Sequence, residues 1–208
     1  MTPRFTTSVD EKQKILDFCS EKFVSEGFYK ITIDEIAQEI HASKNTIYKF
    51  FPTKEKLIWA AIENIISRVT SKINTVLDSD DNALEKLVKM LGILSSNIIR
   101  FTDKWMRDMQ IHAPALWEKV DKIRQEIMYR NISKIIRQGQ KEKVFKDYPA
   151  ELIITIFVSS LRGVVSPRFL LNSSFTNREA LRYTLEILLN GILTEKGTSV
   201  LKTIKLPI

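Results

Sequence analysis

The sequence predicts an all-α protein. Gly and Pro occur only six times each in 208 residues, and both are rare inside segments with helical apolar spacing. Four segments begin with the pattern of a helix capping box, in which a polar side chain precedes Glu by three residues; they start at Ser8, Thr32, Asn82 and Thr176. Because no segment shows sustained alternation of apolar and polar residues, no sheet is expected.

We expect nine helices, over residues 9–26, 33–40, 44–50, 54–77, 82–102, 104–111, 114–139, 149–171 and 176–195. The helix over 54–77 repeats apolar residues every three or four positions, which indicates one long amphipathic rod. We expect two domains, a small one over 1–53 and a larger one over 54–208, with this rod leading from one into the other. The tail from Lys196 onward is basic, has no pattern and is expected to be loosely held.

The composition is that of a soluble protein, with 44% hydrophobic and 27% charged residues. Cys19 is the single cysteine, so no intrachain disulfide can form, and a reducing compartment is expected. The longest uncharged apolar run, over 152–161, is too short to span a bilayer, and the N-terminus has no apolar signal core. A cytoplasmic location follows as an expectation.

The net charge of +7 says little about partners, because residues 1–60 hold nine basic and nine acidic residues. The local distribution is more informative: residues 41–56 carry four Lys and one Glu.

Residues 33–56 predict two short helices joined by the turn His41-Ala42-Ser43. Apolar stripes on the first three helices can close one small core, which leaves the other side of the third helix outward. That outer side carries amides, hydroxyls and ammonium groups, which suit phosphates and base edges. The candidate DNA-binding residues are Ser43, Lys44, Asn45, Thr46, Tyr48, Lys49 and Lys54.

Residues 15–63 resemble the N-terminal domain of the TetR family of bacterial transcriptional regulators. The matching pieces are Ile15-Leu16, Phe23, Glu26-Gly27-Phe28, Thr32, Glu35-Ile36-Ala37, Ser43-Lys44, Thr46-Ile47-Tyr48 and Phe51-Pro52-Thr53-Lys54-Glu55-Lys56-Leu57. They cover about a quarter of the chain; the rest is similar only in its helices and length. The resemblance implies a homodimer that represses promoters and leaves its DNA operator when a small, largely apolar effector binds the second domain.

By position, the resemblance implies that Ser43 and Lys44 lie near phosphates and base edges and that Thr46 faces the major groove. It also implies that Tyr48 and Lys54 hold the DNA backbone; Lys49 is added because its side chain points outward. The chain departs from the family pattern at three positions. His41 replaces a Gly that needs positive φ, Asn45 replaces a common Gly, and Phe50 replaces a polar side chain.

Aromatic and thioether side chains gather in residues 101–129 and suit a cavity for an apolar small molecule, although each of them singly is more typical of core filling. For the group as a whole, the family resemblance favours a ligand cavity. The candidate ligand residues are Phe101, Trp105, Met109, His112, Trp117, Met128 and Tyr129. The segment over 149–195 has a wider apolar arc than one buried face needs, so it is expected to form a homodimer interface. Within it, Arg162 could reach solvent, pair across the interface or bind an acidic ligand.

Catalytic signatures are lacking: there is no Gly-rich phosphate loop, HExxH, GxSxG or paired metal-ligand spacing. We therefore expect no enzymatic activity, cofactor or metal. Two other classes remain open. One is an architectural or nucleoid-associated DNA-binding protein without an effector, and the other is a helical ligand-binding or enzymatic protein whose N-terminal unit makes protein contacts.

Overall fold

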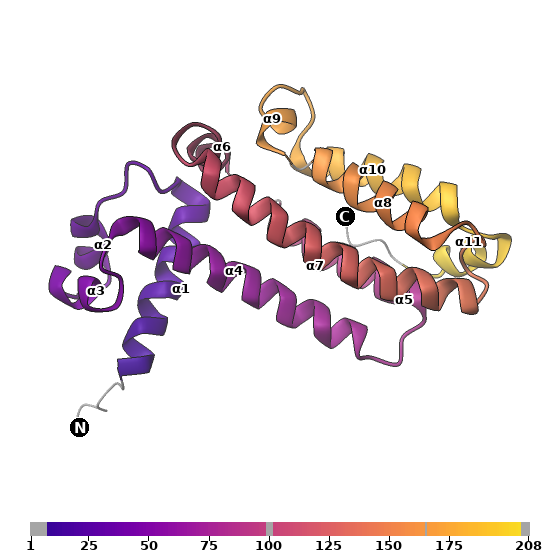
Figure 1. The fold of residues 1–208 in the computed structure, drawn as a ribbon, viewed down its shortest axis with the longest axis horizontal. Helices are drawn as coiled ribbons and strands as arrows, with labels where there is room; N and C mark the ends of the chain where they lie inside the picture. Colours follow the sequence, from indigo (N-terminus) through magenta and orange to yellow (C-terminus); the bar gives the residue numbers. More distant parts are fainter. Residues whose placement is uncertain (1–7, 99–101, 165, 205–208) are drawn as a thin grey trace. The chain divides into compact units, whose positions relative to one another are not determined.

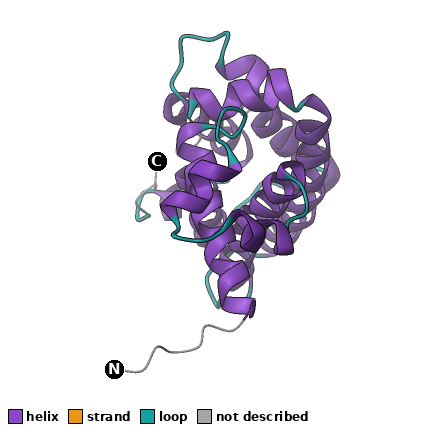
Figure 2. Cartoon of the chain, turned by 90° about the vertical axis from the view of Figure 1, so that its left-hand side faces the viewer, coloured by secondary structure: helices purple, strands orange, loops and turns teal. Residues whose placement is uncertain are grey.

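The computed structural model describes residues 8–98, 102–164 and 166–204. Within these residues the chain is helical, apart from loops and one isolated bridge between Phe145 and Leu193 (Figures 1 and 2). The helices are α1 (Ser8–Glu26), α2 (Ile33–Glu39), α3 (Lys44–Phe50), α4 (Lys54–Leu77), α5 (Ala83–Ile98), α6 (Asp103–Arg107), the π-helical turn η1 (Asp108–His112), α7 (Pro114–Lys141), α8 (Ala150–Val164), α9 (Pro167–Leu170), α10 (Asn177–Ile192) and α11 (Glu195–Leu201). The all-α prediction is confirmed.

The chain forms two compact units. The first combines residues 1–68 with 101–113, and the second combines 69–100 with 114–208. The boundary expected at residue 53 therefore falls inside the first unit, and α4 passes from one unit to the other between Arg68 and Val69.

The core of the first unit is built from the predicted stripes. Ile15, Cys19 and Phe23 of α1 are at most 1% exposed, as are Ile36 of α2 and Ile47 of α3. Burial raises the pKa of the Cys19 thiol to about 12, so the thiolate that nucleophilic or redox chemistry requires is not formed near neutral pH. Cys19 is a core residue.

The second unit packs α7 against α5 and α8, and α10 against α8 and α5. Its core includes Leu87 of α5, Ile135 of α7 and Phe157 of α8, each at most 1% exposed. At the end of α7, Gly139 lies directly against the Phe145 ring, where a Cβ atom would overlap the ring. This close contact fixes the position of the loop between α7 and α8.

Two sequence-based predictions are wrong in this unit. The single helix expected over 149–171 ends at Val164, and a separate turn, α9, begins at Pro167. Proline lacks an N–H and disfavours helical backbone in the residue before it, which accounts for the break. The first part of the tail that was expected to be loose, as far as Leu201, instead lies in α11, where the Thr194 hydroxyl caps the helix by accepting from the Gly197 N–H at 3.0 Å.

Helix boundaries near residues 99–113 also differ from expectation. The helix expected over 82–102 is described only as far as Ile98, because 99–101 lie outside the described residues. The helix expected over 104–111 is divided into α6 and η1. Across the described chain, no helix has the length and apolarity needed to cross a membrane.

Candidate nucleic-acid interface

The turn between α2 and α3 is fixed by local hydrogen bonds. Thr32 and Glu35 form the predicted capping box at the start of α2. After α2, His41 adopts a φ of +54°, the left-handed conformation that its position was expected to need. The Ala42 N–H then donates to the Ala37 carbonyl at 2.9 Å, and Ser43 adopts the extended conformation of an N-cap. The direction of α3 relative to α2 is therefore set by the backbone.

The third helix has one buried side and one open side. Ile47 is fully buried and Phe51, which caps the helix, is 4% exposed. Tyr48 is 43% exposed and lies on the open side of α3, together with most of the other candidate DNA-binding residues. Ser43, Lys44, Asn45 and Lys49 are exposed and Thr46 is partly exposed.

Several of these side chains have partners within the protein. The Ser43 hydroxyl accepts from the Thr46 N–H at 3.0 Å and lies 2.9 Å from the Thr46 hydroxyl. Lys44 forms an ion pair with Asp34 of α2. The Lys49 ammonium lies 5.4 Å from the centre of the Phe50 ring. The contacts of Lys44 and Lys49 are exposed and therefore weak, so they leave both ammonium groups available to a partner.

Lys54 begins α4 and is tied to the loop between α1 and α2. Its Nζ donates to the Tyr29 carbonyl at 2.7 Å. Burial lowers the pKa of Lys54, although the carboxylates of Glu55, Asp108 and Glu35 act in the opposite direction. The ammonium is therefore partly desolvated and held in place before any partner arrives.

The α1–α2 loop is anchored by residues that sequence reasoning did not assign to this unit. The Asp108 carboxylate accepts from the backbone N–H groups of Phe28 at 2.6 Å and Tyr29 at 2.8 Å. Gly27 permits this approach, because its φ is +78° and a Cβ there would lie 2.5 Å from Asp108 Oδ2. His112 stacks on Tyr29 with ring centres 3.4 Å apart. The segment over 102–112 thus fixes the α1–α2 loop, and the Tyr29 carbonyl of this loop accepts the hydrogen bond from Lys54.

A cleft of about 780 Å³ marks the seam between this segment and α1–α2. Its acidic residues are engaged internally: Glu26 and Glu39 pair with Lys22, Glu35 caps α2, and Asp108 binds the loop. The cleft therefore belongs to the packing of the first unit.

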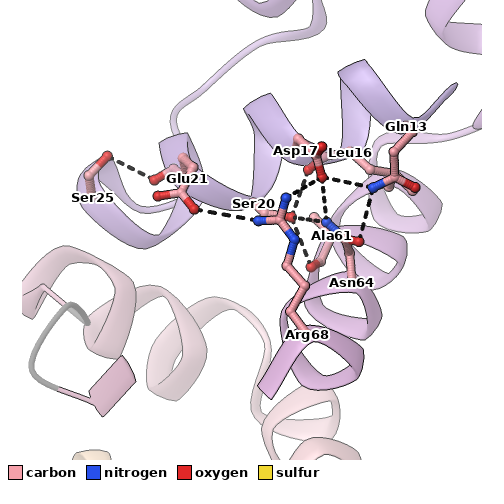
Figure 3. A network of polar contacts seen from close by, with 9 residues as sticks. All are labelled: Gln13, Leu16, Asp17, Ser20, Glu21, Ser25, Ala61, Asn64 and Arg68. Carbon is pink, nitrogen blue, oxygen red and sulfur yellow. Dashed lines mark hydrogen bonds and ion pairs between the residues drawn. The ribbon is translucent and has the colours of Figure 1, made fainter. Parts of the chain in front are cut away.

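A polar network joins α1 to α4 (Figure 3). Asp17 Oδ1 accepts from Gln13 Nε2 at 2.7 Å, Asn64 Nδ2 at 3.1 Å and Arg68 NH2 at 2.6 Å. Asn64 Nδ2 also approaches Ser20 Oγ, at 3.1 Å. Because the side of α4 that carries Asn64 and Arg68 is fixed to α1, a rotation of this part of α4 would break charge-assisted hydrogen bonds.

The structure divides the six described candidate ligand residues between the two units. Trp105 and Met109 are core residues of the first unit, and the edge of the Trp105 ring meets the Phe28 ring with centres 5.5 Å apart. His112 belongs to the first unit as well. Trp117, Met128 and Tyr129 lie on α7 in the second unit, and Phe101 lies outside the described residues. Among the described residues, no group of three or more His, Cys, Asp or Glu side chains could hold a metal ion.

The helix α3 is short, is capped at its start, is anchored by one buried side and leaves its polar side open. It follows α2 across a fixed turn. This arrangement defines a helix-turn-helix DNA-binding protein. Comparison with known proteins gives the family. Residues 15–61 match the family model described as bacterial regulatory proteins, tetR family. Residues 15–61 are therefore similar to the DNA-binding region of the TetR family of bacterial transcriptional regulators.

Similarity to known proteins extends beyond residues 15–61. YvaF of Bacillus subtilis, described as an uncharacterized HTH-type transcriptional regulator, is 20% identical over 176 residues, which cover 84% of this chain and 92% of YvaF. The nucleoid occlusion factor SlmA of Vibrio vulnificus is 27% identical over 151 residues, which cover 68% of this chain and 74% of SlmA. A transcriptional regulator from Saccharomonospora viridis, solved in complex with choline, superposes with a TM-score of 0.69 at 19% identity, covering 90% of this chain and all of that one.

Proposed function

We propose that this protein is a homodimeric repressor that binds an operator through α3 and leaves it when a small molecule binds the second unit. The observation that carries the DNA-binding half of the proposal is the open polar side of α3, set on the buried anchors Ile47 and Phe51. In this proposal each α3 enters a major groove, and the two copies contact half-sites one or more helical turns apart.

The candidate residues divide into two roles. Lys54, Tyr48 and Ser43 carry an ammonium or hydroxyl group near a helix start or on its open side, so we assign them to phosphates. Lys44, Asn45, Thr46 and Lys49 lie on or beside the exposed side of α3, so we assign them to base edges and neighbouring phosphates. The ion pair of Lys44 with Asp34 would be exchanged on binding.

Thr46→Ala is expected to change which sequence is preferred, because it removes a hydroxyl and a methyl group that can contact base edges. The discrimination at one base pair should change by about 1–3 kcal/mol, while binding to unrelated duplexes changes little. Selection from a pool of randomised duplexes measures the preference of both proteins. If both select the same sequence with the same strength, Thr46 does not contact a base.

The proposed dimer interface lies within residues 149–195. Apolar side chains remain exposed there on α8 and α10: Leu152 at 55%, Ile156 at 47%, Tyr183 at 43% and Ile187 at 71%. Leu152 and Ile156 are four residues apart on α8, and Tyr183 and Ile187 are four residues apart on α10. The two side chains on each helix therefore lie on one face. Two such faces, repeated in a second copy, supply the apolar surface of a four-helix interface.

Replacing Leu152 and Ile187 together by Glu should dissociate the dimer, because two charges in each copy would have to be buried. The dissociation constant should rise at least about 100-fold, as follows from a loss above roughly 2.8 kcal/mol. Sedimentation velocity measures the association state. Ile111→Glu is the matched control, since Ile111 is 63% exposed but lies in the first unit. A dimer that survives the double substitution unchanged would place the interface elsewhere.

Release by a ligand requires coupling between the units, and α4 is the continuous element that passes through both. We propose that a ligand in the second unit favours an orientation of α4 in which the distance between the two copies of α3 no longer matches the distance between the operator half-sites. A difference of about 1–3 kcal/mol between the two states suffices for useful induction. The choline complex of the Saccharomonospora viridis regulator supports a small-molecule site in this fold.

Selection of fragments from the host genome by the purified protein tests the proposal as a whole. A repressor should enrich a few fragments that share one inverted repeat near promoters. Enrichment of many dispersed sites without a ligand response would favour the nucleoid-associated alternative. Retention of no duplex at low salt would overturn the proposal.

A further inference from the structure

One face of α7 changes from apolar to polar along the helix. This face carries Trp117, Asp121, Arg124, Met128 and Asn131, which are spaced alternately four and three residues apart. At 100° per residue they share an arc of roughly 80° around the helix. The same arc continues through Ile135, which is 1% exposed in the core of the second unit. A core-facing stripe that carries a carboxylate, a guanidinium and an amide needs a physical reason, because burying such groups without partners is costly.

The charges on this stripe do not balance. Asp121, whose side chain is 15% exposed, accepts from Arg162 Nε of α8 at 2.6 Å. The same carboxylate is the group that acts electrostatically on Arg124. Two guanidinium groups therefore depend on one carboxylate, which leaves a net positive charge at the junction of α7 and α8.

Arg124 is the less satisfied of the two. Its guanidinium lies 5.8 Å from the centre of the Trp117 ring, and within the described part of the chain it donates no hydrogen bond. Burial lowers the pKa of Arg124, with Asp121 opposing the shift. A guanidinium has five N–H donors in a fork that matches a carboxylate or phosphate, and none of the five has an acceptor among the residues that the structure describes.

Asn131 adds a second unsatisfied group two turns along the same stripe. The residue is 2% exposed, and its Nδ2 has no hydrogen-bond partner within the described residues. Seven residues of helix place it about 10 Å from Arg124 along the axis of α7. Met128 lies between them and supplies an adaptable apolar surface.

We propose that this stripe is the recognition site for a small organic acid: Arg124 binds the anionic head, Trp117 and Met128 contact the apolar body, and Asn131 donates to an oxygen about 10 Å from the head. The proposal rests on the ligand-released regulator proposed above and specifies the chemistry of its effector. An ammonium ligand would add a second unbalanced positive charge, and a neutral apolar ligand would leave both polar groups unsatisfied. An acid with a distal hydroxyl or carbonyl oxygen would satisfy both.

The test compares ligands that differ only in their polar groups. The thermal midpoint of the full-length protein is measured with octanoate, 8-hydroxyoctanoate, octyl phosphate, 1-octanol and octylammonium, and affinities are measured by calorimetry. Octanoate should raise the midpoint, 8-hydroxyoctanoate should bind more tightly still, and octanol and octylammonium should have little effect. Octyl phosphate distinguishes a phosphate head from a carboxylate head. Acetate at the same concentration should do nothing; an equal response to it would show adventitious anion binding and overturn the proposal.

Arg124→Met keeps the length of the side chain but removes the charge. We expect it to lower octanoate affinity about 10- to 100-fold, the loss of one charge-assisted hydrogen-bonding group. Without ligand it should be as stable as the original protein or more so, because an unbalanced charge has been removed. A purely structural Arg124 would give the opposite result in the absence of ligand.

Arg124→Lys serves if the first variant does not fold, since it keeps the charge but loses the planar fork and should show an intermediate affinity. Arg130→Met is the matched control, because Arg130 is exposed on α7, roughly opposite the stripe at 100° per residue. Octanoate binding that is equal in all variants, or no preference for the acid over the alcohol, would overturn the inference.

The outcomes separate this inference from the proposed function. Acid binding that depends on Arg124 but releases no genomic fragment would support the site and contradict ligand-induced release. Operator binding without any response to the acids would leave the regulator intact and remove the acid site.

Discussion

Lys54→Ala is expected to weaken binding to every duplex, whatever its sequence. We assign the Lys54 ammonium to a phosphate, and the loss of one charge-assisted hydrogen bond costs about 1.5–3 kcal/mol, or roughly 10- to 100-fold in affinity. Binding of the ammonium to the phosphate also releases a counterion from the DNA. The slope of log affinity against log salt should therefore become less steep by about 0.9 for each phosphate that the variant no longer neutralises.

Fluorescence anisotropy with operator and unrelated duplexes at several salt concentrations measures both effects. Lys72→Ala is the control: Lys72 is exposed on the same helix, five turns further along, in the second unit. It removes the same charge, so any loss that comes from net charge alone appears equally in both variants. Equal losses for the two variants would show that Lys54 makes no specific phosphate contact.

The contact of Lys54 with Tyr29 is compatible with this role. An ammonium has three N–H donors, and the Tyr29 carbonyl uses one of them, so two remain for phosphate oxygens. The backbone contact removes much of the freedom of a long side chain before DNA binds, which lowers the entropy that binding must overcome. The α1–α2 loop thus positions the Lys54 ammonium for the phosphate contact that we propose for it.

The parts of the fold that were predictable depend on local signals. The capping box at Thr32 and Glu35, the N-cap at Ser43 and the turn at His41 involve residues within four positions of each other, so the sequence exhibits the pattern directly. Apolar spacing likewise identified the buried sides of α1, α2 and α3, because a helix places such residues on one face whatever it packs against.

The features that were not predictable depend on long-range contacts. The hydrogen bonds from Phe28 and Tyr29 to Asp108 join residues 80 and 79 positions apart, and no spacing rule connects them. For the same reason Trp105 and Met109 were expected among ligand residues, whereas they pack in the first unit. Arg124 and Asn131 were passed over because the sequence shows a polar residue but not the burial that makes it unusual.

Asp108→Ala is expected to destabilise the first unit by about 2–4 kcal/mol. The carboxylate accepts two backbone N–H groups, and the Phe28 N–H belongs to a residue that is only 3% exposed. Leaving a buried donor unsatisfied costs about 1–3 kcal/mol, and the second bond to the ionised group adds to this. Because Tyr29 also holds Lys54, a loosened loop should weaken DNA binding even though Asp108 touches no phosphate in this proposal.

Hydrogen exchange distinguishes this effect from general destabilisation. In Asp108→Ala the amides of Phe28 and Tyr29 should exchange faster, with the change extending to the end of α1 and the start of α4, while amides in α7 and α8 keep their rates. Gln110→Ala is the matched control, since Gln110 is an exposed residue of the same π-helical turn. Asp108→Asn should lie between the two, because its amide oxygen still accepts but carries no charge. If the loop amides exchange no faster in Asp108→Ala than in Gln110→Ala, the carboxylate does not hold the loop, and its link to Lys54 and the DNA is lost with it.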